Sequence, residues 1–438
     1  MRSCGSKFSA AVPLAGKSRS DHLFHIFPMM KRLLYSTLAL TASVMAAEKP
    51  PAALPPYFSV KYQASEKPGE LAMAVTYSLW IPPDAKALRG VIVHQHGCGI
   101  SSANTGLTAA YDLHWQALAK KWNCALLGPA YHLQKDTECR KWCDPRNGSD
   151  AAFQRALQDF AKQSQHPELA TAPWCLWGHS GGGFWSSLML TLHPERIAAI
   201  FFRSGSAFGA WTRGEIPQPE LTPAVYTVPF LFVGGVKEAQ DKTHGPPRID
   251  DRKMWKLWRE HDAPGGMSSD PLSGHECGDS RYLAIAFLDA CLKQRLGDSG
   301  LKPAGKGVII DDSWLPDADF AKVWASYNKL GKPADMTPPP APTNVRFANG
   351  ALTWQAEADL ESGLGGFIIE RDGKEIARLP EKPAGKIGTP LFQGLSGGDT
   401  PIIAQPPMRF IDTTAKPGET HEYRVISVNA AGLRSAAR

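Results

Sequence analysis

A serine within the pentapeptide Gly178–Gly182 (GHSGG) most constrains how this 438-residue chain can fold. The preceding run, Ala172–Trp177, is apolar and typical of a buried strand, whereas Phe184–Leu190 is typical of a buried helix. A serine in G-x-S-x-G between strand and helix occupies a strained turn, where side chains at the flanking positions would collide with backbone. The pattern predicts a nucleophile elbow with Ser180 as nucleophile, and the alternative is a glycine-rich turn without a catalytic role.

A second glycine-containing loop follows an apolar strand upstream. Val91–Val93 leads into His96–Gly99, an H-G-x-G loop. In hydrolases with such an elbow, this loop supplies one backbone N–H of the oxyanion hole, and the residue after the nucleophile supplies the other. We therefore expect Cys98 and Gly181 to be the two donors, with a simple tight turn as the alternative.

The candidate base and acid come later in the chain. His275 lies on a glycine-containing loop before the amphipathic run 282–292, which is the usual place of a triad base. The apolar strand 229–233 ends in two glycines, and an acid is expected a few residues beyond them. Glu238 is the favoured acid and Asp241 its rival.

Tyr57–Gly297 resembles the α/β-hydrolase superfamily, within it the secreted esterases related to polyhydroxybutyrate depolymerases and feruloyl esterases. The likeness is carried by the loop His96–Cys98, the helix Trp115–Ala119 and the strand end Pro129–Tyr131. The chain order serine, acid, histidine is also that of this superfamily. The resemblance implies acyl-enzyme chemistry without a metal or organic cofactor. His179 stands where polymer depolymerases more often have a larger or hydroxylated residue, so the likeness supports the fold more than the substrate.

The fold class expected from the remaining pattern is α/β, a doubly wound and mostly parallel sheet. Strand and helix patterns alternate from residue 91 to residue 292, which is typical of a parallel sheet with helices on both faces. Active sites in such sheets lie beyond the carboxyl ends of the strands. Cys98, Ser180, Glu238 and His275 all fall there.

Four segments are predicted along the chain. Residues 1–47 form a leader and signal peptide, with translation starting near Met30, so the protein is expected to be secreted or periplasmic. The α/β-hydrolase domain covers 48–330, and a Pro-rich linker covers 331–343. A small all-β sandwich covers 344–438.

This last segment resembles a fibronectin type III module. Trp354 lies in an early strand, Asp372-Gly373 is a hairpin signal, and Tyr423–Gly432 has the form Y-x-V-x-x-V-N-x-x-G. The resemblance implies a seven-strand sandwich that acts as a spacer, or alternatively contacts a polymer.

Export changes how the eight cysteines are interpreted, of which Cys4 lies in the leader. Cys139 and Cys143 could close a small disulfide loop, and Cys98 could pair with Cys277 if their loops converge. Free buried thiols are expected at Cys124, Cys175 and Cys291. The sequence leaves the connectivity open, and the spacing fits no zinc site.

Composition excludes some classes of partner. The net charge of +6 is mild and no Lys/Arg block is dense, so nucleic acid is not expected. Stable membrane insertion is not expected either, because no apolar run outside the leader is long enough to span a bilayer. Trp185, Phe208 and Trp211 could line a cleft for an aromatic or sugar-linked ester, with core packing as the alternative for each.

These observations predict a secreted serine hydrolase that cleaves carboxylic esters, namely plant-polymer side-chain esters or polyesters, through a Ser-His-Glu triad. One alternative is an exported serine peptidase of the same fold. Another is an inactive hydrolase-fold protein that binds polymer. The oligomeric state is not predicted.

Overall fold

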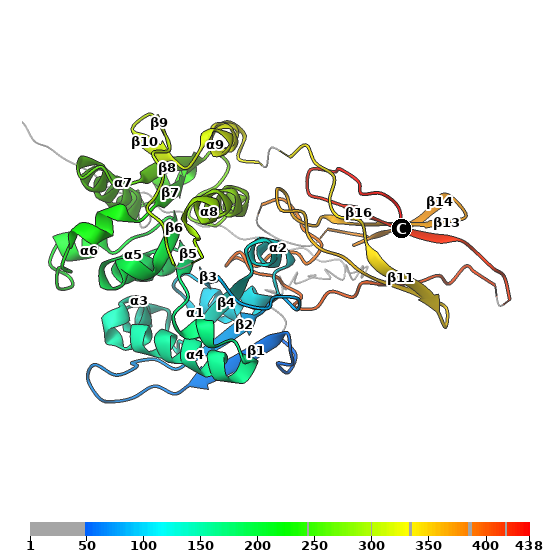
Figure 1. Ribbon diagram of the computed structural model, residues 1–438, viewed down its shortest axis with the longest axis horizontal. Coiled ribbons are helices and arrows are strands. Elements are labelled where there is room, and N and C mark those ends of the chain that lie inside the picture. Colours follow the sequence, from blue (N-terminus) through cyan, green and yellow to red (C-terminus); the bar gives the residue numbers. More distant parts are fainter. Residues whose placement is uncertain (1–48, 243–244, 299, 333–334, 384–387, 417) are drawn as a thin grey trace, which may run out of the picture. The chain divides into compact units, whose positions relative to one another are not determined.

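The computed structural model describes residues 49–438, except for 243–244, 299, 333–334, 384–387 and 417 (Figure 1). The predicted leader and signal peptide lie outside the described residues. The described residues belong to one compact unit by their contacts. None of the helices in the described part of the chain combines the length and apolar character that a membrane crossing requires.

An eight-stranded sheet in the order β1-β2-β4-β3-β5-β6-β7-β8 forms the centre of this unit. The first two strands, β1 (Tyr57–Tyr62) and β2 (Val75–Trp80), are antiparallel to their neighbours. The other six run parallel to one another: β3 (Gly90–Gln95), β4 (Cys124–Tyr131), β5 (Trp174–His179), β6 (Ile197–Arg203), β7 (Phe230–Gly235) and β8 (Gly265–Asp270). The predicted α/β-hydrolase fold is thereby confirmed.

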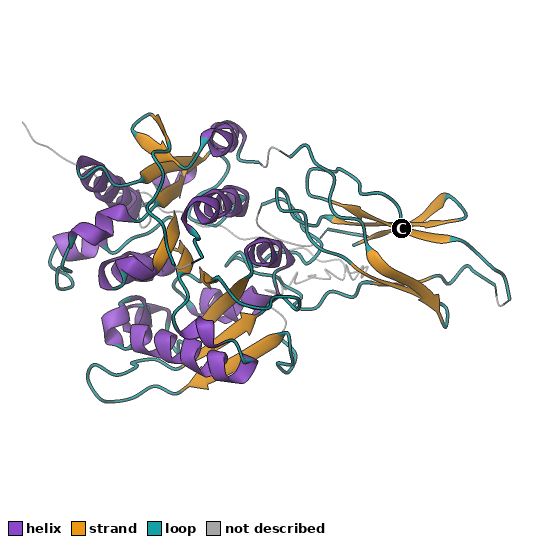
Figure 2. Ribbon diagram, viewed as in Figure 1, coloured by secondary structure: helices purple, strands orange, loops and turns teal. Residues whose placement is uncertain are grey.

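Helices cover both faces of the sheet (Figure 2). One apolar core lies beneath α4 (Ser149–Ser164), α5 (Gly181–Leu192) and α7 (Gly245–Glu260). The second lies beneath α2 (Leu113–Trp122), α8 (Ser280–Arg295) and α9 (Ala318–Leu330). Three short helices, α1 (Ile100–Thr105), α3 (Arg140–Cys143) and α6 (Phe208–Thr212), lie in the connections.

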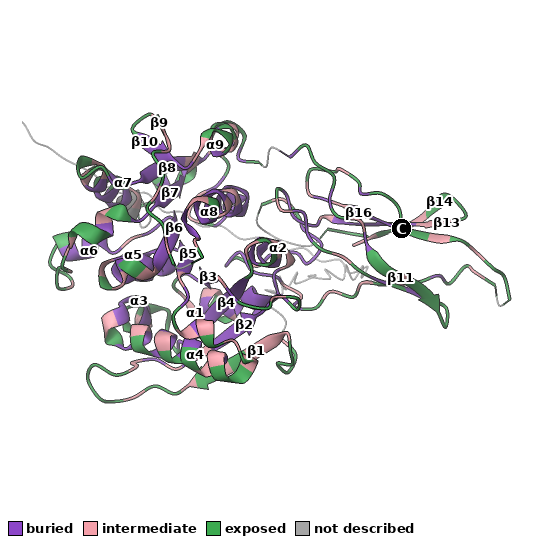
Figure 3. Ribbon diagram, in the orientation of Figure 1, coloured by how far each residue is buried: buried purple, intermediate pink, exposed green. Residues whose placement is uncertain are grey.

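The strand before the elbow shows why the central strands are apolar over most of their length. Leu176 belongs to the first core, whereas Cys175 and Trp177 belong to the second. Successive side chains of a strand point to opposite faces, so a strand covered on both sides needs apolar residues at every position. Figure 3 shows these strands buried at the centre of the hydrolase-fold region.

The two-stranded hairpin β9 (Val308–Ile310) and β10 (Ser313–Leu315) precedes α9, and the elements described in the C-terminal region beyond α9 are all strands. Its six strands form two antiparallel sheets: β11 (Thr343–Ala348), β12 (Ala351–Gln355) and β15 (Arg409–Ile411); and β14 (Lys374–Leu379), β13 (Gly366–Arg371) and β16 (Tyr423–Val428). The chain end also lies beside β16, where the Val425 amide donates to the Arg438 carbonyl at 2.7 Å. Trp354, Phe367 and Val425 share the core between the sheets. The fibronectin type III likeness stays a prediction.

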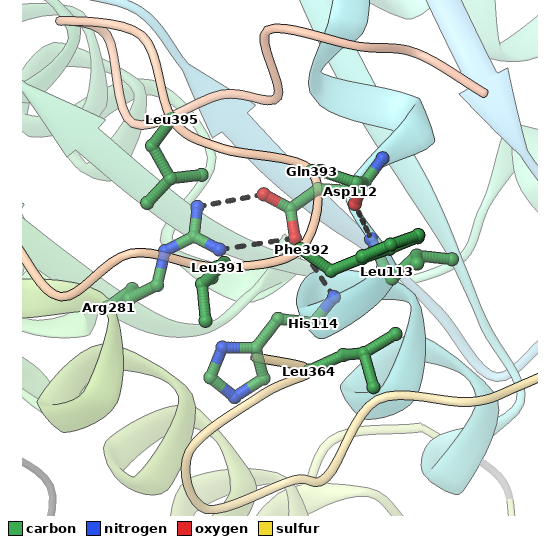
Figure 4. Close-up of a pocket in the computed structure, with 9 residues that line it drawn as sticks. All are labelled: Asp112, Leu113, His114, Arg281, Leu364, Leu391, Phe392, Gln393 and Leu395. Atoms are coloured by element: carbon green, nitrogen blue, oxygen red, sulfur yellow. Dashed lines mark hydrogen bonds and ion pairs between the residues drawn. The ribbon is translucent and has the colours of Figure 1, made fainter. Parts of the chain in front are cut away.

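The C-terminal β region contacts the hydrolase-fold region through the connection between β14 and β15 (Figure 4). The Gln393 side chain accepts a hydrogen bond from the Leu113 amide at 2.9 Å and donates one to the Tyr111 carbonyl at 2.8 Å. Beside it, Arg281 of α8 forms an ion pair with Asp112 at 2.7 Å, and both side chains are buried. The Pro-rich run is therefore followed by a module that packs against the hydrolase fold.

Candidate active site

Ser180 occupies the turn between β5 and α5, with φ 52° and ψ −113°. A positive φ is strained for any residue that carries a Cβ. The turn is held by the Ser180 amide, which donates to the Arg203 carbonyl on β6 at 2.8 Å. A Cβ at Gly178 would overlap the Gly182 carbonyl, so the close approach of strand to helix requires glycine there.

Ser180 and His275 line the same cavity, which encloses about 210 Å³. The two predicted oxyanion donors, Cys98 and Gly181, line it as well. Its other walls come from Cys139, Cys143, Phe184, the turn 204–206, Gly209 and Ala210, with Arg140, Arg213 and Asp250 completing the lining. Four of the residues singled out in the sequence thus meet at one site.

His275 contacts Glu238, since His275 Nδ1 lies 2.6 Å from Glu238 Oε1. The other oxygen of Glu238 accepts from the Ser204 hydroxyl at 2.9 Å and from the Gly235 amide at 2.8 Å. Burial acts to raise the pKa of Glu238, but the hydrogen bond to His275 and the charge of Arg203 outweigh it, and the pKa lies below its ordinary value. Glu238 is therefore a buried carboxylate.

The position of Glu238 follows from the local chain geometry. Glu238 is the third residue of the 3-10 turn Val236–Gln240, and its carboxylate reaches back to the amide of Gly235 that precedes the turn. Asp241, the rival acid, follows this turn and is exposed. The carboxylate that meets His275 is that of Glu238.

Arg203, at the end of β6, contacts both Glu238 and the loop that carries His275. This residue was not predicted from the sequence. Its guanidinium is fully buried and lies 3.8 Å from the Glu238 carboxylate. It donates to the Ser273 hydroxyl at 2.9 Å and to the Gly274 carbonyl at 2.8 Å. Further bonds reach the carbonyls of Glu276 and Cys277. In the sequence, the one feature that could have indicated this role is a charged residue at the end of the apolar strand Ile197–Phe202.

His179, the residue before the nucleophile, also holds the histidine loop. Its Nε2 lies 2.7 Å from the His275 carbonyl. Burial, with the charges of His275 and Arg203, holds the pKa of His179 well below its ordinary value, so this ring is neutral. Because a carbonyl oxygen only accepts, the proton of His179 is on Nε2.

The predicted oxyanion donors lie next to each other. A Cβ on Gly181 would come within 3.3 Å of the Cys98 amide nitrogen and would overlap Cys98 Sγ. Cys98 itself is bonded to Cys139, with their Cα atoms 5.4 Å apart. This disulfide joins the H-G-x-G loop to α3 at the wall of the cavity.

Both disulfide pairings suggested from the sequence are wrong. Cys139 precedes the single helical turn α3, whose last residue, Cys143, is buried in the first core as a free thiol. Cys277 is buried in the second core, on the other face of the sheet, and is also free. The expected free thiols at Cys124, Cys175 and Cys291 are confirmed.

None of the three aromatic residues proposed to contact substrate lines the cavity. Trp185 is buried and donates to the Ser149 hydroxyl at 3.2 Å. Phe208 and Trp211 are buried against each other, with ring centroids 5.4 Å apart. All three therefore pack in the core, which was the alternative given for each. The aromatic residue that lines the cavity is Phe184.

Charged side chains alternate beside the cavity. The Arg140 guanidinium lies 4.0 Å above the Phe184 ring and 3.3 Å from Glu215. Arg213 pairs with both Glu215 and Asp250 at 2.7 Å. Lys253 also lies 3.5 Å from the Asp250 carboxylate, so both acidic side chains of this row are paired with basic ones.

Behind this row lies a second buried carboxyl group. Asp251 accepts a hydrogen bond from the Ser206 hydroxyl at 2.6 Å. Burial raises the pKa of Asp251 to about 8, so the group is mostly protonated at neutral pH.

Comparisons with known proteins find no matching family model and no matching curated protein. Poly(aspartic acid) hydrolase-1 from Sphingomonas sp. KT-1 is similar over 50% of this chain and 94% of its own, with 16% identity and a TM-score of 0.38. An S-formylglutathione hydrolase from Agrobacterium tumefaciens matches over 55% and 95%, again with 16% identity and a TM-score of 0.38. With TM-scores this low, the fold assignment rests on the strand order of the chain itself.

Proposed function

We propose that this protein is an exported serine hydrolase that cleaves carboxylic esters through an acyl-enzyme on Ser180. One observation carries the proposal: His275, which lines the same cavity as Ser180, is held at Nδ1 by the buried Glu238 carboxylate at 2.6 Å. A carboxylate at Nδ1 orients a histidine so that its other nitrogen can act as a general base toward a serine.

In the proposed reaction, the Ser180 hydroxyl attacks the ester carbonyl carbon while His275 Nε2 takes the hydroxyl proton. Glu238 keeps the remaining proton on Nδ1 and stabilises the imidazolium. The tetrahedral intermediate collapses, and the leaving alcohol departs with the proton held by His275. Water then attacks the acyl-enzyme by the same route, which releases the acid and restores Ser180.

The backbone N–H groups of Cys98 and Gly181 are the proposed donors to the oxyanion. Their proximity supports this role, and so does the disulfide that holds the Cys98 loop. Donors fixed before the reaction stabilise the developing charge without reorganisation, and losing one costs about 10²–10³ in turnover.

The cavity favours a small acyl group. Its volume of about 210 Å³ and the small residues Gly209 and Ala210 in its wall leave room for a short acyl chain. The exposed side chains of Arg140 and Arg213 would face the rest of a larger substrate. We therefore propose short-chain side-chain esters of a polymer as the substrate class. Export is supported by the disulfide beside the site, because such bonds persist in oxidising compartments.

The test is hydrolysis of p-nitrophenyl acetate, butyrate and octanoate and of methyl ferulate by residues 48–438. Ser180→Ala should abolish turnover, and acetate should be preferred to octanoate. Ser186→Ala is the matched control, because Ser186 is buried on α5 and its hydroxyl has no hydrogen-bond partner among the described residues. A folded wild-type protein that turns over none of these esters would refute the proposal.

A further inference from the structure

Residues 388–404, which we call the 388–404 segment, belong by sequence to the C-terminal β region but are buried in part against the hydrolase fold. They lie in the connection between β14 and β15. Leu391, Phe392 and Leu395 line the junction shown in Figure 4, together with Leu113 and His114 of α2. Ala404 belongs to the second core of the central sheet. The segment is thus part of the packed hydrolase unit.

One group of contacts reaches the loop that carries His275. The Thr389 amide donates to Asp279 Oδ1 at 2.6 Å, and the Thr389 hydroxyl donates to Asp279 Oδ2 at 2.8 Å. Asp279 is the residue at which this loop ends and α8 begins. Nearer the histidine, the Cys277 thiol lies 4.0 Å from the Gly397 carbonyl.

A second group of contacts reaches the loop that carries Cys98. His94 and Thr105 bracket this loop, His94 on β3 and Thr105 at the end of α1. Gly398 lies so close to the Thr105 hydroxyl that a Cβ there would overlap it. The His94 ring lies 3.5 Å from the Asp399 carboxylate and stacks on Trp177, three residues before Ser180, with centroids 4.0 Å apart.

Asp399 joins the two groups of contacts. Its carboxylate is 1% exposed, accepts from Arg281 Nε at 2.9 Å and faces His94 on its other side. Arg281 also donates to the Asp399 carbonyl at 2.8 Å and is itself paired with Asp112. Burial acts to raise the pKa of Asp399, but the charges of Arg281 and His94 outweigh it and the pKa lies below its ordinary value.

We propose that the 388–404 segment positions the loops of Cys98 and His275, and that Asp399 is the positioning residue through which it acts on both. The inference rests on the proposed function, because it assigns roles relative to that reaction. The contacts lie behind the loops, at Asp279 and Cys277 on one side and at His94 and Thr105 on the other. Small displacements of groups that must meet a reacting carbonyl reduce turnover strongly. The C-terminal β region would then serve catalysis without touching substrate.

Asp399→Asn tests this role. Asp399 has φ 59°, a conformation that asparagine tolerates, so the change removes the charge with little backbone strain. Asp412→Asn is the matched control: Asp412 is buried in the same β region and pairs with Arg371 at 2.6 Å, away from the catalytic loops. We expect Asp399→Asn to lower kcat by about 10-fold or more with KM within about twofold, and Asp412→Asn to leave both unchanged.

Hydrogen exchange gives a readout that does not depend on activity. In folded Asp399→Asn, peptides covering 97–105 and 271–279 should exchange faster than in wild type, whereas Asp412→Asn should leave them unchanged. Thr389→Val, which removes only the hydroxyl bond to Asp279, should affect only the 271–279 peptide.

The outcomes separate this inference from the proposed function. A wild type without Ser180-dependent ester hydrolysis would refute the proposed function, and the exchange pattern would still decide whether the segment holds the loops. Equal effects of Asp399→Asn and Asp412→Asn on kcat and on exchange would overturn the positioning role. So would a folded Asp399→Asn protein with wild-type kcat and exchange.

Discussion

Loss of the bridge between Cys98 and Cys139 should weaken both folding and turnover. The two cysteines are 41 residues apart in sequence. Loop-closure entropy for a loop of that length corresponds to about 4 kcal/mol of stability at 25 °C. Gly181 lies directly against the two sulfur atoms, so the same bridge fixes the wall beside both proposed oxyanion donors.

The double variant Cys98→Ser/Cys139→Ser removes the bridge and leaves no unpaired thiol at either position. We expect its free energy of unfolding to fall by about 3–4 kcal/mol in urea titrations followed by tryptophan fluorescence. We expect kcat on p-nitrophenyl acetate to fall by up to about 10²-fold, the lower end of the loss seen when one oxyanion donor is removed.

Cys143→Ser is the matched control, since Cys143 lines the same cavity as a free, buried thiol. It should lose little stability and little activity. The reasoning fails if the double variant and Cys143→Ser have the same free energy of unfolding. It also fails if wild type kept under thiol reductant, with the bridge shown to be open, retains full kcat.

Three further predictions concern the buried charges. Glu238→Gln should lower kcat/KM by at least about 10²-fold, because the amide no longer fixes the His275 tautomer. Asp241→Asn should leave kcat/KM within about twofold of wild type, and steady-state kinetics of the two variants test both expectations. Arg203→Met should cost about 3–5 kcal/mol in urea unfolding, because it leaves Glu238 buried without its cation, and the pKa of Glu238 should rise, which pH–rate profiles would register. The Asp251 pKa, raised to about 8, means that the folded state holds a proton that the unfolded state releases above about pH 4. Stability should therefore fall between about pH 4 and pH 8 in wild type, and Asp251→Asn should flatten that dependence in denaturation curves recorded across this range.

The residues of the candidate site that could be predicted from the sequence are those with local signatures. Ser180 lies in a glycine-rich turn between two apolar runs, and such a turn can be recognised from about twenty residues of sequence. Glu238 follows from its position after an apolar strand that ends in two glycines, and His275 from its place on a glycine-containing loop before the amphipathic run 282–292. The choice of Glu238 over Asp241 was open in the sequence, since only the fold shows which carboxylate meets His275.

The parts that were missed or wrong depend on contacts between distant segments. The partner of Cys98 was missed because nothing in the spacing of the cysteines shows that α3 folds back over the elbow. Arg203 was missed because a charged residue at the end of an apolar strand is usually exposed, and here carbonyl groups of the histidine loop surround it. Trp185 and Trp211 were misplaced because composition shows how many aromatic residues a chain has, not which of them reach a cavity.

The segment boundary predicted at the Pro-rich run also depends on contacts between distant parts of the chain that the sequence does not show. Composition changes sharply at 331–343, which predicts a linker, and the fibronectin type III resemblance implies a spacer or polymer-contact module beyond it. Yet Asp399 meets Arg281 across 118 residues of sequence, and both side chains are buried, so removing Asp399 leaves Arg281 with Asp112 alone. A chain ended at residue 343 would leave Arg281 without one of its two carboxylates and would uncover the second core where Ala404 packs. Inactivity of such a truncated chain would therefore not show that the β region binds substrate, and only single substitutions such as Asp399→Asn can separate positioning from binding.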